Sequence, residues 1–236
     1  MAARLAASPP AALVSGANRG LGLEVCRQLA ARGRPVLLTA RDGAQADAAA
    51  AELARAGLPV RGLPLDVSDA ASVARLVATL RAEGPTLGAL VNNAGVSLRG
   101  FNAQVVRDTL AVNFHGAARV SEALLPLLVP RGCVAMVSSG MGELAGFPPA
   151  LRAPLERATL SRGELEAWLA DFARAVAERT LVRQGWPRSA YSVSKAALNA
   201  LTRILAREQG PAGARVNAVC PGWVRTRMGG RGASRG

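Results

Sequence analysis

The chain has 236 residues, half of them hydrophobic, and carries a formal net charge of +13. This length fits one α/β domain with a sizeable buried core. No apolar run approaches the roughly 20 residues of a membrane-spanning helix, and three scattered cysteines and one histidine exclude a disulfide framework and a metal cluster. We therefore expect no metal and no membrane attachment. We also expect a cytoplasmic location, where thiols stay reduced.

The strong positive charge raises the question of a nucleic-acid partner. The arginines are spread along the chain, however, and aromatic side chains that could stack on bases do not alternate with them. We therefore expect no nucleic-acid partner, and solvated arginines on helix faces. Residues 1–10 contain one arginine, Arg4, and no acid, so an unstructured tip and a mitochondrial presequence are both open for them.

Short apolar runs alternate with longer amphipathic stretches. The apolar runs predict strands over Ala11–Ser15, Pro35–Thr39, Val60–Leu65, Leu87–Asn92, Cys133–Ser139 and Ala214–Val219. The other stretches predict helices over Leu21–Arg32, Ala44–Ala56, Ser68–Glu83 (with Ser68 as its cap), Val105–Val129 and Ser189–Gln209. This alternation is typical of an α/β fold, and it predicts a doubly wound, Rossmann-like parallel sheet with helices on both faces. We expect a single domain over residues 1–236.

One segment interrupts the alternation. Residues 140–188 contain two helical stretches, near Ala150–Ala158 and Gly163–Arg179, with no strand between them. We interpret this segment as a helical insertion packed on the domain.

A glycine-rich turn follows the first predicted strand and precedes a helix. The pattern is Gly16-x-x-x-Gly20-x-Gly22. Glycines permit a tight turn and let a pyrophosphate approach the backbone, and the helix N-terminus supplies unpaired N–H groups with partial positive charge. Glycine turns are common, but this position between strand and helix is the context that dinucleotide binding requires.

Selectivity between NAD and NADP is expected at the end of the second strand. An acidic residue there would bind the ribose hydroxyls of NAD, but the chain has Ala40 at that place, followed by Arg41. Arg41, with Arg19 of the glycine turn, could pair with a 2′-phosphate, which favours NADP(H). The alternative is that Arg41 is one more surface arginine.

The only tyrosine and the only lysine stand four residues apart, as Tyr191 and Lys195. At this spacing two side chains share one face of a helix. An ammonium beside a phenol favours the phenolate, so we expect Lys195 to lower the pKa of Tyr191 from about 10. The alternative is a surface pair without function.

Together these motifs resemble the short-chain dehydrogenase/reductase family, and within it the NADPH-dependent carbonyl reductases. The resemblance covers nearly the whole chain, in family order. It rests on the glycine turn, Asp66-Val67, Asn92-Asn93-Ala94-Gly95, Asn113, Ser139, Tyr191-x-x-x-Lys195 and Cys220-Pro221-Gly222-Trp223-Val224-Arg225-Thr226.

The resemblance implies reduction of ketones, aldehydes or quinones, with four catalytic residues. Tyr191 would be the general acid and Lys195 would hold the nicotinamide ribose. Ser139, favoured over its neighbour Ser138, would bind the substrate oxygen. Asn113 would hold a water that links Lys195 to solvent.

The same resemblance implies two binding sets. Substrate-pocket residues would be Ser139, Met141 and Trp223, with Trp186 as a further candidate; core packing is an equal alternative for Met141, Trp223 and Trp186. Cys220 could be a modifiable thiol, but we expect it to be buried and inert. Residues that bind the cofactor would be Gly16, Asn18, Arg19, Gly20, Leu21, Gly22, Arg41, Asp66, Val67, Asn93, Ala94, Gly95, Tyr191, Lys195, Pro221, Gly222, Val224 and Thr226.

Two expectations concern what surrounds the site. In carbonyl reductases a similar insertion covers the surface by which relatives assemble, which implies a monomer acting on a small-molecule carbonyl substrate. Family members continue past the last motif with another helix and strand, so we expect this sheet to lack its last strand. That gap motivates an alternative function, a catalytically weak NADP(H)-binding or interaction protein.

Overall fold

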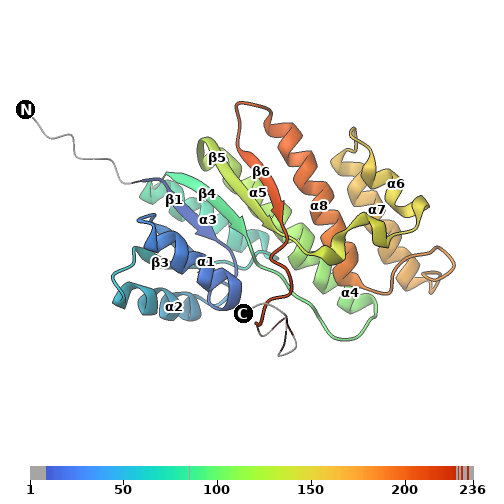
Figure 1. Ribbon diagram of the computed structural model, residues 1–236, viewed down its shortest axis with the longest axis horizontal. Coiled ribbons are helices and arrows are strands. Elements are labelled where there is room, and N and C mark those ends of the chain that lie inside the picture. Colours follow the sequence, from blue (N-terminus) through green and yellow to red (C-terminus); the bar gives the residue numbers. More distant parts are fainter. Residues whose placement is uncertain (1–8, 85, 227, 229, 231–232, 234–236) are drawn as a thin grey trace, which may run out of the picture.

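The computed structural model describes residues 9–84, 86–226, 228, 230 and 233. They form one parallel sheet in the order β3-β2-β1-β4-β5-β6 (Figure 1). The chain reverses its winding between β1 and β4, which creates the switch point of a doubly wound sheet and confirms the predicted fold class. The strands are β1 (Ala11–Val14), β2 (Val36–Ala40), β3 (Val60–Pro64), β4 (Leu87–Asn92), β5 (Leu128–Val137) and β6 (Arg215–Val219).

Helices lie on both faces of this sheet (Figure 1). Helices α1 (Gly20–Ala31) and α2 (Gly43–Arg55) share one hydrophobic cluster with β1 and β2. A larger cluster joins the other face to the remaining helices. These are α3 (Ala70–Glu83), α4 (Ala103–Leu110), α5 (Ala117–Leu124), α6 (Pro149–Glu156), α7 (Arg162–Ala177) and α8 (Ala190–Gln209).

Burial along the strands shows how far each face is covered. Every residue of β1 and β2 is buried, whereas along β5 buried residues alternate with partly exposed ones from Gly132 onward. Strands buried on both faces have nearly continuous apolar sequences, and alternation indicates one covered face. The centre of the sheet near β1 is therefore enclosed, while β6 packs against α8 and β5 contacts both α5 and α8.

Several predicted boundaries are wrong, among them those of the strand expected over Cys133–Ser139, because β5 covers Leu128–Val137. The stretch expected to be one helix over Val105–Val129 is divided into α4, a π-helical turn (Ala111–Gly116), α5 and a 3-10 turn (Leu125–Leu127) that contains Pro126. Apolar residues at the end of this stretch belong to β5, which begins at Leu128, and periodicity alone could not separate them.

The expected cap of α3 is also one residue off. The cap is Asp69, not Ser68, and its carboxylate accepts hydrogen bonds from the N–H groups of Ala71 (2.9 Å) and Ser72 (3.1 Å). A carboxylate at a helix N-terminus satisfies unpaired donors and favours the helix dipole.

Helices α6 and α7 pack against α8, and α7 also contacts α4. Four aromatic side chains contact one another within the helical insertion of residues 140–188: Phe147, Trp168, Phe172 and Trp186. Trp186 is 6% exposed, so it belongs to the core.

Arginines of α8 anchor the same segment. Arg207 donates hydrogen bonds to the carbonyl oxygens of Ala158 and Leu160, both at 2.6 Å, and Arg203 donates to Leu155. These bonds satisfy carbonyl groups at and beyond the end of α6.

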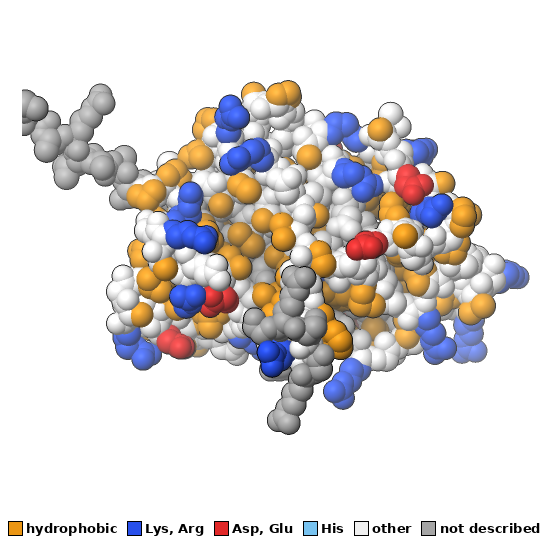
Figure 2. Space-filling view, viewed as in Figure 1, with side chains coloured by type: hydrophobic (Ala, Val, Ile, Leu, Met, Phe, Trp, Pro, Cys, Tyr) orange, Lys and Arg blue, Asp and Glu red, His pale blue; other side chains and the backbone are white. Residues whose placement is uncertain are grey.

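Lys and Arg side chains are scattered over the face shown in Figure 2 and do not form one continuous patch. In the described part of the chain, no helix is long and apolar enough to cross a membrane. Nor do three or more His, Cys, Asp or Glu side chains of these residues gather as a metal site.

Candidate active site

The predicted site residues gather at the carboxyl ends of the strands, beside the switch point between β1 and β4. Ser15 follows β1, Asn93 follows β4, and Ser138 and Ser139 follow β5. This is the edge at which open α/β sheets bind their ligands.

The glycine turn is packed tightly against the segment after β4. A Cβ at Gly16 would lie 2.8 Å from the Cα of Ala94, and one at Gly22 would lie 2.5 Å from the Nδ2 of Asn93. That Asn93 amide donates to the carbonyl oxygens of Ser15 and Gly16, both at 2.9 Å. Gly16 and Gly22 therefore let the turn after β1 pack closely against the segment after β4, where a larger residue would clash.

Ser15 contributes more than its sequence position suggested. Its hydroxyl accepts hydrogen bonds from the N–H groups of Asn93 and Ala94, both at 3.0 Å. The hydroxyl thus ties the turn after β1 to the turn after β4, and the two turns form one rigid unit.

The start of α1 is suited to bind phosphate. Its cap residue Arg19 gives no side-chain hydrogen bond, and no acidic residue occupies the first turn. Gly20 is exposed with φ of +57°, and a Cβ added there would have the Thr226 methyl as its nearest neighbour, at 3.6 Å. The N–H groups and dipole of α1 are therefore accessible to an anion. Pro221, Gly222 and Val224 lead the chain from β6 to Thr226 beside this turn.

The end of β2 carries the predicted selectivity group. Arg41 is exposed, and neither Arg41 nor Arg19 forms an ion pair with another described residue. A residue that the sequence did not single out lies next to them. Gln45 accepts from the Asn18 amide at 2.7 Å and donates to the Asp42 carboxylate at 3.2 Å. Gln45 thereby links the glycine turn to the start of α2.

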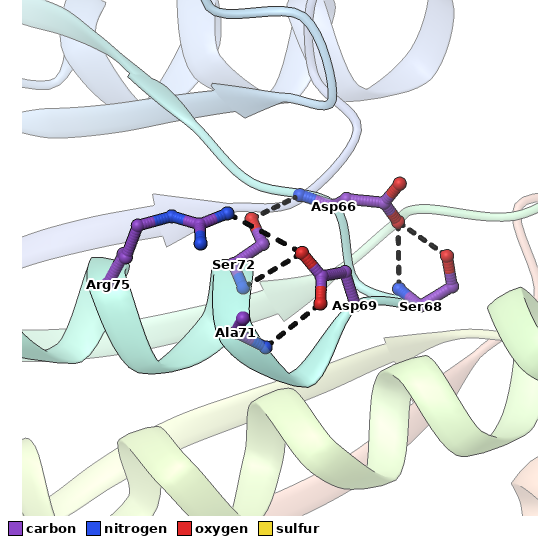
Figure 3. Close-up of polar contacts among 6 residues, drawn as sticks. All are labelled: Asp66, Ser68, Asp69, Ala71, Ser72 and Arg75. Atoms are coloured by element: carbon purple, nitrogen blue, oxygen red, sulfur yellow. Dashed lines mark hydrogen bonds and ion pairs between the residues drawn. The ribbon is translucent and has the colours of Figure 1, made fainter.

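Asp66 and Val67 follow β3 and form a closed turn. The Asp66 carboxylate accepts from the N–H (2.9 Å) and the hydroxyl (2.6 Å) of Ser68, while the Asp66 N–H donates to Ser72 at 3.0 Å (Figure 3). The Val67 carbonyl accepts from Arg119 at 2.8 Å, and Val67 packs against Gly116. This turn is fixed by its own hydrogen bonds, with the half-buried Asp66 at the edge of the sheet.

Tyr191, Lys195 and Ser139 lie together. The Lys195 Nζ is 5.7 Å from the centre of the Tyr191 ring and donates to the Val137 carbonyl at 2.7 Å. A hydrogen bond with Ser139 lowers the pKa of Tyr191, although burial, the larger influence, raises it. Burial also lowers the pKa of Lys195 to about 8.

The expected pKa of Tyr191 is therefore wrong in direction: it is raised above its ordinary value of 10.0, first by burial. The Lys195 ammonium lies over the Tyr191 ring and donates to the Val137 carbonyl, so it offsets little of the rise that burial causes in the Tyr191 pKa. Tyr191 is consequently protonated at neutral pH.

Asn113 stands in the π-helical turn between α4 and α5. Its Oδ1 accepts from the Val96 N–H at 2.8 Å, and its Nδ2 donates to the Val96 carbonyl (2.9 Å) and the Ser194 hydroxyl (3.0 Å). A Cβ at Gly95 would lie 3.5 Å from Asn113 Oδ1 and 3.8 Å from Lys195 Nζ. Glycine keeps the space between these two polar groups free of a side chain. Insertions of π type are frequent at functional sites.

The two serines after β5 have different environments. The Ser138 hydroxyl is buried and donates to Asn199 at 2.6 Å, whereas Ser139 is half-buried and reaches Tyr191. The preference for Ser139 agrees with this geometry. A groove of about 460 Å³ contains both serines, Asn199 and Cys220.

Three further expectations meet mixed outcomes. Met141 and Trp223 are each 58% exposed, so neither is a core residue. Cys220 is exposed, contrary to the expected burial, and its sulfur accepts a hydrogen bond from the Gly140 N–H at 3.1 Å. The reason is its place after β6, at the uncovered edge of the sheet.

Comparison with known proteins agrees with this arrangement. The profile described as short chain dehydrogenase matches residues 10–149, and that described as enoyl-(acyl carrier protein) reductase matches residues 170–235. Carbonyl reductase [NADPH] 3 of Rattus norvegicus is 39% identical over 229 residues, covering 92% of this chain and 82% of the relative. Carbonyl reductase [NADPH] 1 of Pongo abelii is 38% identical, covering 95% of this chain and 85% of the relative.

Solved structures give the same result. Salutaridine reductase from Papaver somniferum superposes with a TM-score of 0.88 at 28% identity, covering 94% of this chain and 89% of that one. Menthone neomenthol reductase from Mentha piperita gives 0.84 at 31% identity, covering 91% and 90%. With the parallel sheet, the glycine turn and the Tyr191–Lys195 pair in place, the chain belongs to the short-chain dehydrogenase/reductase family.

Proposed function

We propose that this protein reduces carbonyl groups of small molecules to alcohols with NADPH, with Tyr191 as the general acid. The observation that carries the proposal is the meeting of Tyr191, Ser139 and Lys195 at the sheet edge that also holds the glycine turn. The relatives named Carbonyl reductase [NADPH] support the substrate class and the cofactor.

The roles follow from the protonation states. NADPH, when bound, supplies a hydride to the carbonyl carbon. The protonated Tyr191 gives its proton to the carbonyl oxygen, so hydride and proton together complete the alcohol. The Ser139 hydroxyl binds the same oxygen as negative charge develops on it. The Lys195 ammonium stabilises the tyrosinate that remains, because opposite charges attract strongly in a desolvated site.

Asn113 and Gly95 serve the return of the proton. The space beside Gly95 lies between Asn113 Oδ1 and Lys195 Nζ. A water there would accept from Lys195 and donate to Asn113, and would connect the ammonium to solvent.

The cofactor choice rests on charge. Arg19 and Arg41 are exposed without an ion-pair partner among the described residues, and Ala40 provides no carboxylate for ribose hydroxyls. A 2′-phosphate would satisfy both guanidinium groups, so NADPH is the preferred cofactor over NADH. We further propose a monomer, since α6 and α7 pack against α8 and α7 also contacts α4. We propose a cytoplasmic location as well, because the three described cysteines are free thiols.

The test is turnover of a quinone and an aromatic aldehyde, followed by NADPH absorbance, beside the same assay with NADH. Wild type should be active with NADPH, and Tyr191→Phe should lose at least about 100-fold in kcat while binding NADPH unchanged by calorimetry. NADPH binding by wild type without turnover of any carbonyl would instead favour the alternative, a binding protein.

A further inference from the structure

Asn199 of α8 forms hydrogen bonds with one residue before Ser139 and one residue after it. The Asn199 Oδ1 accepts a hydrogen bond from the hydroxyl of Ser138 at 2.6 Å. Its Nδ2 donates to the carbonyl of Gly142 at 3.2 Å. Asn199 thus holds the residue immediately before Ser139 and the residue three positions after it.

Outside α8, the turn that follows Ser139 is supported by Cys220, whose sulfur accepts a hydrogen bond from the Gly140 N–H at 3.1 Å. Ser139 has an extended backbone and caps the short turn Gly140–Gly142, with its hydroxyl accepting from the Met141 N–H at 3.2 Å. Gly142 touches α8 directly, because a Cβ there would lie 2.6 Å from the backbone carbon of Lys195. The turn therefore rests on α8 at Gly142 and is fastened to it by Asn199.

Asn199 also has a defined relation to the other site residues. It follows Lys195 by four residues and Tyr191 by eight, so all three project from one side of α8. Any movement of the Ser139 turn relative to α8 changes the distance from Ser139 to Tyr191. The amide of Asn199 opposes such movement at two points.

We propose that Asn199 is a positioning residue that fastens the turn carrying Ser139 to α8, the helix that carries Tyr191. The inference rests on the proposed function for its role in turnover, but the contact it describes exists independently of turnover. An amide suits this task because it is both a donor and an acceptor. Its oxygen accepts from the Ser138 hydroxyl, and its NH2 group donates to the Gly142 carbonyl. Alanine would remove both bonds and leave the buried Ser138 hydroxyl without its partner.

The single tyrosine allows a direct test without substrate. Tyrosinate absorbance in an alkaline titration reports only on Tyr191, which faces Ser139, Lys195 and Cys220. Ser139→Ala should raise the midpoint, since the bond from Ser139 lowers the pKa. Asn199→Ala should raise it in the same direction by about half a unit or more, and Ser139→Ala with Asn199→Ala should raise it no further than Ser139→Ala alone.

A kinetic cycle on the same four proteins gives the second readout. Asn199→Ala should lower kcat about ten-fold with NADPH binding within about two-fold of wild type, and should cost less than about two-fold once Ser139 is already alanine. Ser138→Ala, which removes one of the two bonds, should act in the same direction with a smaller effect. Thr202→Val is the matched control, because among the described residues the Thr202 hydroxyl bonds only to the Leu198 carbonyl of its own helix.

The titration tests the positioning role of Asn199, and turnover by wild type tests the proposed function. An unchanged Tyr191 midpoint in Asn199→Ala, or effects that add fully to those of Ser139→Ala, would overturn the positioning role. A wild type without turnover would contradict the proposed function alone, and the titration would still decide for or against Asn199.

Discussion

The ammonium of Lys195 donates a hydrogen bond to the carbonyl of Val137 at 2.7 Å. This bond joins the N-terminal half of α8 to the last residue of β5, two positions before Ser139. The only lysine among 29 basic residues is 4% exposed. Lysine, unlike arginine, has a compact ammonium whose pKa responds to burial. This difference explains why position 195 has a lysine in a chain whose other basic residues are arginines, apart from His115.

Burial of Lys195 should make stability depend on pH. Its pKa falls from 10.5 to about 8 in the folded protein, so between these values the unfolded chain binds more protons and the free energy of unfolding rises with pH. Against Lys195→Met, wild type should gain on the order of 1–3 kcal/mol from about pH 7 to about pH 10.

Urea unfolding of both proteins, followed by tryptophan fluorescence, measures this difference. Cys26, whose pKa burial raises to about 12, is present in both and cancels. Above about pH 10 the raised pKa of Tyr191 acts in the opposite sense, because its ionisation then favours unfolding. A difference between the two proteins that stays constant with pH would show that Lys195 is not desolvated.

Gly22 should not tolerate a side chain. Gly22→Ala would place a methyl 2.5 Å from the Asn93 amide and 2.8 Å from the Ala17 Cα, so we expect a loss of about 1–3 kcal/mol and weaker NADPH binding. Gly163→Ala is the matched control, since Gly163 lies in α7 with no atom within 4 Å of the added Cβ. That change should stabilise by about 0.5–1 kcal/mol. Equal melting temperatures for the two variants would contradict the packing described for the turn.

Arg41 should decide between the two nicotinamide cofactors. Arg41→Ala should raise the KM for NADPH about 10- to 100-fold, the value of a charged hydrogen bond, and leave the KM for NADH within about two-fold. Arg55→Ala is the control, because Arg55 is also exposed but lies at the far end of α2. Parallel loss for both cofactors would mean that Arg41 does not meet the 2′-phosphate.

The anchoring of α6 can be tested through α8. Replacing both Arg203 and Arg207 with alanine removes the bonds to the carbonyls of Leu155, Ala158 and Leu160. We expect faster proteolysis within residues 149–162 and a lower melting temperature, because three carbonyl groups lose their partners.

Arg152→Ala provides the comparison for that experiment. Within the described part of the chain, Arg152 pairs only with Glu156, at 3.7 Å, and such solvent-exposed pairs contribute little to stability. Light scattering on the same variants checks the proposed monomer. Dimers in the double variant alone would support the view that the insertion covers an assembly surface.

Much of this fold follows from local pattern. The alternation of apolar runs and amphipathic stretches predicted all six strands and the sheet class, because each strand needs only its own apolar residues to be recognised. The glycine turn and the Tyr191–Lys195 spacing predicted a dinucleotide site and its catalytic pair in the same way. Where two elements share one apolar stretch, as α5 and β5 do around Leu125–Val129, pattern failed.

What the tertiary structure decided depends on residues far apart in sequence. Lys195 meets a carbonyl 58 positions away and Ser138 meets Asn199 across 61, so neither the direction of the Tyr191 pKa nor the fastening of Ser139 could be read locally. Burial of a phenol or an ammonium is set by every element packed around it, and only the assembled sheet and helices fix that environment.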